Sequence, residues 1–217
     1  MSQALILGAS GLVGLHTTKY LLADNSFDKI YAVSRHGIPI QHERLIQIKA
    51  DFDTIDSPIR DLQIDHLFSC LGSTKSKTPN KEDYKKVDHD YPIKVARILK
   101  ENGLHSASIV SALGANKDSM TFYMRLKAMT EQSFEELGLD QLFIMQPSLI
   151  VGNRKEKRLA EKFASILFNI INPLLLGDYK KYRSIKGSVI ARALVETTKL
   201  DGKGIFRFNT QEIKELT

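Results

Sequence analysis

Residues 4–14 read Ala-Leu-Ile-Leu-Gly-Ala-Ser-Gly-Leu-Val-Gly, and this stretch decides the fold of the chain. The apolar residues Ala4–Leu7 predict a short buried strand, and the residues after the glycines have the pattern of a helix. Gly8 permits a tight turn, Gly11 lets the backbone approach a pyrophosphate, and Gly14 allows the helix to pack closely. A helix start also offers free N–H groups and partial positive charge to an anion. The stretch therefore predicts a loop that holds the phosphates of a dinucleotide.

The first two-thirds of the chain alternate strand-like and helix-like segments. Short apolar runs predict buried strands at Ala4–Leu7, Ile30–Val33, Leu45–Ile48, Leu67–Cys70, Ala107–Ser111 and Leu142–Met145. Helical patterns lie between them, at about residues 12–23, 54–61, 82–101 and 119–137. This alternation predicts an α/β fold, a doubly wound parallel sheet with helices on both faces. In such a sheet, ligands bind at the carboxyl ends of the strands.

The C-terminal part of the chain has a different texture. After Gly152 come a charged segment, an apolar run, a helical pattern at residues 188–199 and a short strand pattern at Ile205–Phe208. These roughly 65 residues are too few for an independent domain with a good core. We therefore expect a single domain over residues 1–217, in which residues 153–217 contribute a small cap on the substrate side.

Composition and charge exclude several classes of ligand and partner. Hydrophobic residues make up 42% and charged residues 26% of the 217, which is typical of a folded protein. A single cysteine, Cys70, excludes a disulfide framework, and the six histidines show no metal-ligand spacing, so we expect no metal. The formal charge of 31 − 25 = +6 suits an anionic ligand. The lysines between residues 75 and 86 lack interleaved aromatic residues, so we expect no nucleic-acid partner.

The sequence also predicts the cellular compartment of the protein. The first residues lack the basic segment of a secretory signal, and the lone cysteine suits a reduced compartment. The longest apolar run, Phe163–Gly177, contains two asparagines and a proline and falls short of the ~18 residues of a membrane span. We expect a cytoplasmic protein without a membrane span, and we expect this run to form a cap or dimer helix. A homodimer is left open.

The end of the second predicted strand indicates the type of cofactor. An NAD-specific site usually has an acidic residue about 20 residues after the glycines, bonded to the adenosine ribose. This strand instead ends in Ser34 and Arg35, with no acid. Arg35 suits a 2′-phosphate as a charged partner, and Ser34 adds a hydroxyl donor. We therefore expect NADP(H) to be preferred over NAD(H).

A tyrosine and a lysine supply candidate chemistry. Tyr123 and Lys127 are four residues apart and so share one face of a predicted helix. A nearby ammonium stabilises a phenolate, so such a pair exchanges a proton with an alcohol or carbonyl. Tyr182 and Lys186 have the same spacing, but they lie just before a helix start, where the side chains need not converge. Ser111 ends the fifth strand, where its hydroxyl is placed to bond a substrate oxygen.

Taken in order, these motifs resemble a known family. The chain contains Gly-x-x-Gly-x-x-Gly, Ser34-Arg35, Asp51-Phe52, Cys70-Leu71-Gly72, Ser111 and Tyr123-x-x-x-Lys127. This set is similar to the short-chain dehydrogenase/reductase superfamily, which implies a Rossmann fold. Three further motifs, Cys-Leu-Gly-Ser-Thr at 70–74, Val87-Asp88-x-Asp-Tyr91 and Gln146-Pro147-Ser148, resemble its atypical members that include the Tat-interacting oxidoreductase-like proteins. The resemblance covers roughly residues 3–195.

The resemblance implies roles for individual residues. The cofactor would be held by Gly8, Ser10, Gly11, Leu12, Val13, Ser34, Arg35, Asp51, Phe52, Cys70, Leu71, Gly72, Tyr123, Lys127 and Pro147. The catalytic set would be Ser111, Tyr123 and Lys127. Ala112 stands where relatives often carry a second serine, which removes one hydroxyl from any relay. We interpret Cys70 as a buried loop residue, and we expect Asp88-His89-Asp90 to cap a helix or face solvent.

These observations predict an NADP(H)-dependent oxidoreductase that acts on a small alcohol or carbonyl compound, with Tyr123 as proton donor and acceptor. Two alternatives remain. One is a regulatory or redox-sensing protein that binds NADP(H) with little turnover, although such a protein has no need of a proton-transfer set. The other is an enzyme like the sugar-nucleotide epimerases, for which the short C-terminal part leaves little room.

Overall fold

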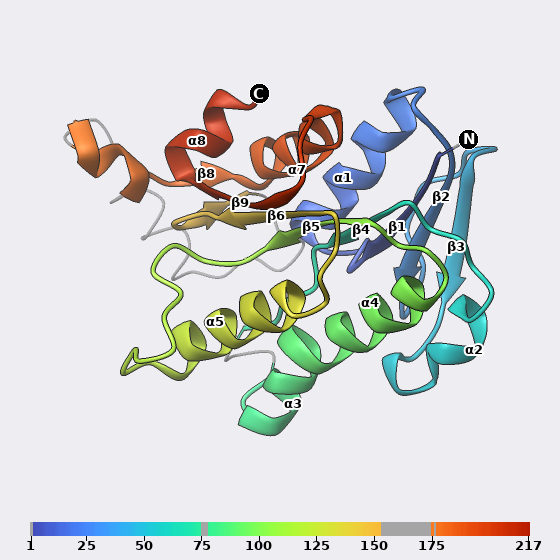
Figure 1. Cartoon of the computed structure of the whole chain (residues 1–217), viewed down its shortest axis with the longest axis horizontal. Coiled ribbons are helices and arrows are strands. Elements are labelled where there is room, and N and C mark those ends of the chain that lie inside the picture. The colour runs from blue at the N-terminus through green and yellow to red at the C-terminus, as the bar shows by residue number, and fades with distance from the viewer. Residues whose placement is uncertain (1, 75–77, 153–174, 176) are drawn as a thin grey trace.

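The computed structural model describes residues 2–74, 78–152, 175 and 177–217. Seven parallel strands form its central sheet in the order β3-β2-β1-β4-β5-β6-β9 (Figure 1). Their bounds are β1 Ser2–Leu7, β2 Phe27–Ser34, β3 Leu45–Lys49, β4 His66–Ser69, β5 Ser106–Val110, β6 Gln141–Gln146 and β9 Gly204–Asn209. The strand order reverses beside β1, which is the switch point of a doubly wound sheet. The predicted α/β Rossmann fold is confirmed.

Helices cover both faces of the sheet, as Figure 1 shows. Helices α1 (Leu12–Ala23), α7 (Gly187–Glu196) and α8 (Thr210–Glu215) lie on one side. Helices α3 (Lys81–Lys85), α4 (Tyr91–Glu101) and α5 (Phe122–Glu135) lie on the other, and the short α2 (Asp56–Ile59) follows β3. Alternate residues of β1 enter the two cores, Leu5 and Leu7 on the α4–α5 side and Ala4 and Ile6 on the α1–α7 side. Because both faces are buried, the strand reads as a continuous apolar run.

The helix predicted at residues 82–101 is divided into three parts. Between α3 and α4 the chain forms a π-helical segment, Lys86–Asp90. Pro92 at the start of α4 has no N–H to give to the carbonyl of Asp88, four residues earlier, and its ring crowds that carbonyl. The hydroxyl of Thr130 on α5 donates to the Asp88 carbonyl instead, at 3.1 Å. The wider turn thus has a local cause and a tertiary partner.

The C-terminal residues add a strand to the sheet and helices to one of its faces. Strand β9 extends the sheet beyond β6, and α7 packs beside α1 on one face. Two short strands, β7 (Ile150–Val151) and β8 (Ile185–Lys186), pair outside the main sheet. The rest of the predicted cap, residues 153–174 and 176, lies outside the described residues, as does most of the apolar run that begins at Phe163. Within the described ranges, no helix combines the length and apolarity needed to cross a membrane.

Candidate active site

The glycine-rich turn after β1 is tightly packed. Gly8 has a φ of 77°, and a Cβ there would stand 2.9 Å from the carbonyl oxygen of Cys70. A Cβ on Gly14 would approach the carbonyl oxygen of Gly8 to 2.3 Å. Only glycine fits these two positions, because the backbone after β4 and the positive φ restrict Gly8, and the start of α1 packs directly on the turn at Gly14.

The first turn of α1 is left open to an anion. Gly11 is the N-cap residue and has no side chain to bond the first N–H groups, and no acidic residue lies in this turn. Ser10 and Gly11 are both exposed. Leu12 turns its side chain away to pack against the C-terminal part, since a Cβ on Gly187 would stand 2.7 Å from it. Backbone N–H groups, together with the Ser10 hydroxyl, are therefore what this loop offers a phosphate.

The end of β2 carries an unsatisfied hydroxyl beside two cations. Ser34 is 3% exposed, and its Oγ has no hydrogen-bond partner among the described residues. Arg35 follows it, exposed and with no ion pair in the described part of the chain. Lys49, at the end of β3, lies opposite Ser34 in the register, and its Cε would be 2.9 Å from a Cβ on Gly37. Lys49 was not among the predicted residues, because the sheet register and not the local sequence brings it here.

Asp51 and Phe52 lie after β3 with different exposures. Asp51 is exposed, and its carboxylate accepts from the backbone N–H of Asp53 at 3.1 Å. Phe52 is 8% exposed and stacks on Tyr91 with ring centroids 5.3 Å apart. Phe52 thus belongs mostly to the core, and Asp51 presents an exposed carboxylate at this corner.

Tyr123 and Lys127 lie together on α5. The Lys127 Nζ stands 5.9 Å from the centre of the Tyr123 ring. Tyr123 is 38% exposed, whereas Lys127 is 5% exposed. The ammonium group of Lys127 also donates to the carbonyl oxygen of Val110, at the end of β5, at 3.3 Å. The tyrosine therefore faces solvent above a buried lysine that is anchored to the sheet.

Asp88 is the partner of Lys127, and the expectation that it caps a helix or faces solvent is wrong. Its carboxylate lies 3.1 Å from Lys127 Nζ, and the side chains are 1% and 6% exposed. Burial acts to lower the pKa of Lys127, but the charge and hydrogen bond of Asp88, together with the nearby Tyr123 and Glu131, outweigh it and the pKa is raised. The other carboxylate oxygen of Asp88 accepts from the backbone N–H of Ser73 at 2.6 Å. Pro92, which frees the Asp88 carbonyl, was the one sequence signal that this turn is unusual.

Ser111 lies at the same edge of the sheet but bonds a different residue. Its hydroxyl donates to the carboxylate of Glu131 on α5, which is 6% exposed. Gln146 Nε2, at the end of β6, donates to both oxygens of that carboxylate at 3.0 Å. Glu131 follows Lys127 by one helical turn, so α5 supplies the side chains that contact the ends of both β5 and β6. Glu131 was not among the predicted site residues.

The loop after β4 passes next to the Asp88–Lys127 pair. Gly72 is exposed, and a Cβ there would lie 3.5 Å from Asp88 Oδ1 and 3.9 Å from Lys127 Nζ. Leu71 is half-buried beside it. Burial raises the pKa of the Cys70 thiol to about 12, which makes it a poor nucleophile. Pro147 is buried after β6, where its carbonyl accepts from the N–H of Leu113 at 2.9 Å.

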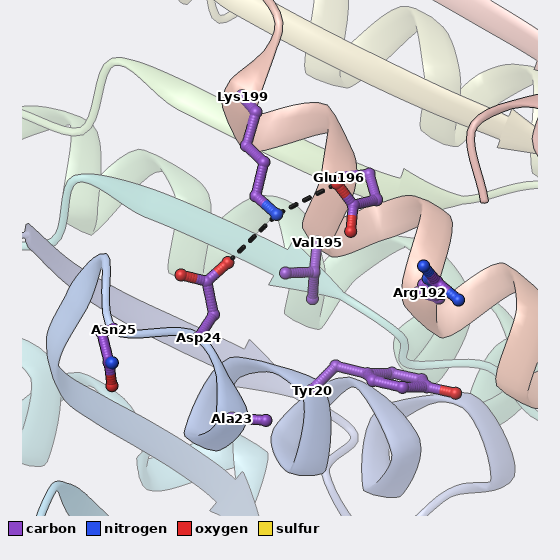
Figure 2. A pocket seen from close by; sticks show the side chains of 8 residues that line it. All are labelled: Tyr20, Ala23, Asp24, Asn25, Arg192, Val195, Glu196 and Lys199. Atoms are coloured by element: carbon purple, nitrogen blue, oxygen red, sulfur yellow. Dashed lines mark hydrogen bonds and ion pairs between the residues drawn. The ribbon is translucent and has the colours of Figure 1, made fainter.

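Two other features do not contribute to this edge. Tyr182 and Lys186 lie in different elements, a 3-10 turn and β8, and the cation over the Tyr182 ring is Lys181. A hollow of about 330 Å³ lies between the C-terminal ends of α1 and α7 (Figure 2), where Lys199 pairs with both Asp24 and Glu196. These two helix ends precede the amino ends of β2 and β9, whereas the residues described above lie at the carboxyl ends of the strands. The described residues contain no cluster of three acidic, cysteine or histidine side chains suited to a metal ion.

Comparison with known protein families gives one family match and several relatives. The model of the NAD dependent epimerase/dehydratase family matches residues 4–184. "Protein FMP52, mitochondrial" from Debaryomyces hansenii is 28% identical over 99% of this chain and 97% of its own. The same protein from Eremothecium gossypii is 34% identical over 70% of this chain and 68% of its own. "Protein HTATIP2" from Rattus norvegicus is 29% identical over 92% of this chain and 82% of its own.

Solved structures match the fold. A UDP-glucose 4-epimerase from Thermotoga maritima has a TM-score of 0.70 at 13% identity, covering 98% of this chain and 80% of that one. A UDP-glucuronic acid 4-epimerase from Bacillus cereus in complex with NAD also reaches 0.70 at 13% identity, covering 97% and 78%. At these identities the likeness extends to the fold alone.

These findings settle two expectations. The resemblance to short-chain dehydrogenases and to Tat-interacting-protein-like members is confirmed by the family match and by HTATIP2. The cytoplasmic location is wrong as an expectation, because the FMP52 relatives are mitochondrial by name. A single cysteine reports a reduced compartment and does not distinguish one such compartment from another.

Proposed function

Because the chain belongs to the NAD dependent epimerase/dehydratase family, we propose that it is an NADP(H)-dependent oxidoreductase acting on an alcohol or carbonyl group of a small molecule. One observation carries the proposal. A half-exposed tyrosine lies over a buried lysine whose charge is held by Asp88, at the carboxyl edge of the sheet. A buried ion pair is expensive to assemble, and burying it beneath Tyr123 suits proton transfer.

Each residue of this group has a distinct task in the proposal. Tyr123 gives the proton from its hydroxyl to a carbonyl oxygen, or takes it from an alcohol. Lys127 keeps a positive charge below the ring, which favours the phenolate that remains after the proton has left. Asp88 and the Val110 carbonyl hold the ammonium group in place. When bound, the nicotinamide nucleotide supplies or accepts the hydride.

The residues of the carboxyl edge fit a phosphorylated dinucleotide. The open first turn of α1 offers N–H groups to a pyrophosphate, and the close packing at Gly8 and Gly14 leaves room for no side chain there. The Ser34 hydroxyl has no hydrogen-bond partner among the described residues, and a 2′-phosphate would supply an acceptor. Arg35 and Lys49 add two cations at the same corner, in support of NADP(H) over NAD(H).

A sugar-nucleotide epimerase is the second candidate, because the matching family model includes epimerases. Such an enzyme uses the same tyrosine and lysine for a transient oxidation of its substrate and returns the hydride. The two candidates differ in whether turnover leaves a net change in the redox state of the cofactor. An oxidoreductase changes the absorbance of NADPH in proportion to substrate turned over, whereas an epimerase shows no net change.

The test is a panel of aldehydes, ketones, alcohols and UDP-sugars with NADPH or NADP⁺, followed by variants. Tyr123→Phe removes only the hydroxyl, so turnover should fall by about 10²–10⁴-fold while NADPH affinity is kept. Tyr182→Phe is the matched control, since it removes the other tyrosine of the same spacing. Full turnover in Tyr123→Phe would refute the mechanism. Absence of any turnover, with NADPH altering affinity for a protein partner, would favour the regulatory alternative.

A further inference from the structure

Glu131 is a buried carboxylate with every oxygen engaged. Ser111 donates to one oxygen, Gln146 Nε2 lies 3.0 Å from both, and Arg207 Nε stands 3.9 Å away. The residue is 6% exposed and lies one helical turn after Lys127. A carboxylate has no proton to give, so the proton in the Ser111–Glu131 bond comes from serine.

This arrangement determines what Ser111 has left to offer. A serine hydroxyl has one proton and two lone pairs, and here the proton is directed at Glu131. Hydrogen bonds to a charged acceptor are stronger than neutral ones, so turning this proton elsewhere would leave a buried carboxylate short of a donor. Toward any other partner, Ser111 therefore presents lone pairs.

We propose that Glu131 fixes Ser111 as a hydrogen-bond acceptor, so that the site favours the alcohol form of its substrate over the carbonyl form. An alcohol donates its O–H to the Ser111 oxygen. A carbonyl has no proton to donate and would meet lone pairs with lone pairs. Glu131 is thus a positioning residue that acts through Ser111. The inference rests on the proposed function, because it needs a substrate oxygen near Ser111.

The variant Glu131→Gln tests this by changing the polarity without changing the shape. The amide oxygen still accepts from Gln146 Nε2, while the amide nitrogen donates to Ser111 Oγ. The Ser111 proton is then free to donate to a carbonyl. Glu135→Gln is the matched control. Glu135 lies on the next turn of α5 and also pairs with Arg207, but among the described residues no hydrogen bond joins Glu135 to Ser111 or Gln146.

The measurement uses dead-end complexes, which require no turnover. Benzyl alcohol is titrated into protein saturated with NADPH, and benzaldehyde into protein saturated with NADP⁺. Glu131→Gln should shift the ratio of the two dissociation constants by about tenfold toward the aldehyde, the size of one hydrogen bond. Glu135→Gln should leave the ratio unchanged. In a Ser111→Ala background, Glu131→Gln should have no effect on it.

Three outcomes would overturn the proposal. The ratio could be equal in the unmodified protein and in Glu131→Gln, or it could shift equally in the Ser111→Ala background. Neutron diffraction from deuterated protein could place the deuterium on Glu131 instead of Ser111 Oγ. A protein that binds neither probe contradicts the proposed substrate class, and the neutron map then decides the role of Glu131 by itself.

Discussion

The ion pair between Asp88 and Lys127 makes the most direct prediction. Its atoms lie 3.1 Å apart, and the side chains are 1% and 6% exposed. At an effective dielectric constant of about 20, two charges at this distance attract by about 5 kcal/mol. Removing one partner of a buried pair typically costs about 3–5 kcal/mol, because the other charge is left unpaired. Asp88→Asn should therefore lower the free energy of unfolding by that amount.

The assay is urea unfolding at pH 7, with a matched surface pair as the control. The asparagine introduced by Asp88→Asn keeps an oxygen for the Ser73 N–H, so the change removes the charge and little else. The control is Asp90→Asn, which breaks the Lys85–Asp90 pair; this pair is 38% and 39% exposed, and its loss should cost at most about 1 kcal/mol. The double variant Asp88→Asn/Lys127→Met removes both charges and should lose much less than the sum of the two single variants.

The pH dependence of stability tests the same ion pair, because its direction follows from the pKa of Lys127. The folded pKa of Lys127 lies above its ordinary value, so the stability it contributes is complete below the unfolded pKa of about 10.4. It is lost as pH rises through the folded pKa. In Asp88→Asn the burial of Lys127 is no longer offset by Asp88, so the folded pKa of this lysine is lower than in the unmodified protein. The difference between the unmodified protein and Asp88→Asn should thus be largest near neutral pH, shrink as the unpaired lysine of the variant loses its proton, and shrink further above about pH 10.4. A loss in Asp88→Asn no larger than in Asp90→Asn would refute the buried-pair interpretation.

Two further predictions concern the cofactor corner and the amino edge of the sheet. Arg35→Ala should weaken NADPH by about tenfold or more and spare NADH, since a charged hydrogen bond contributes about 1.5–3 kcal/mol; equal calorimetric affinities of the unmodified protein for the two nucleotides would contradict it. Burial lowers the pKa of His66 to about 3, so folding excludes a proton that the unfolded chain binds below its ordinary value of 6.5. Stability should fall as pH drops from 6.5 toward 3, by about 2 kcal/mol at pH 5. His66→Gln should lose this part of the acid sensitivity in thermal melts, and the exposed control His36→Gln should keep it.

The glycine turn and the alternating core pattern were readable from the sequence alone. Gly8 needs a positive φ, and the Gly8–Gly14 contact lies within seven residues of chain, so local spacing suffices to predict it. The apolar run Ala4–Leu7 indicates a strand buried on both faces for the same local reason. Tyr123 and Lys127 share one helix, so their approach follows from the helical repeat.

The partners of these residues were decided by the tertiary structure. Asp88 lies 39 residues before Lys127 in the sequence, and only the packing of the π-helical turn against α5 brings the two charges together. The contacts of Ser111 with Glu131 and of Lys49 with the Ser34 corner likewise join separate elements. A local pattern records which face of a helix or strand is buried, because burial repeats with the period of that element. It does not record which charge lies on the opposite element, because that depends on the register and rotation with which the elements pack.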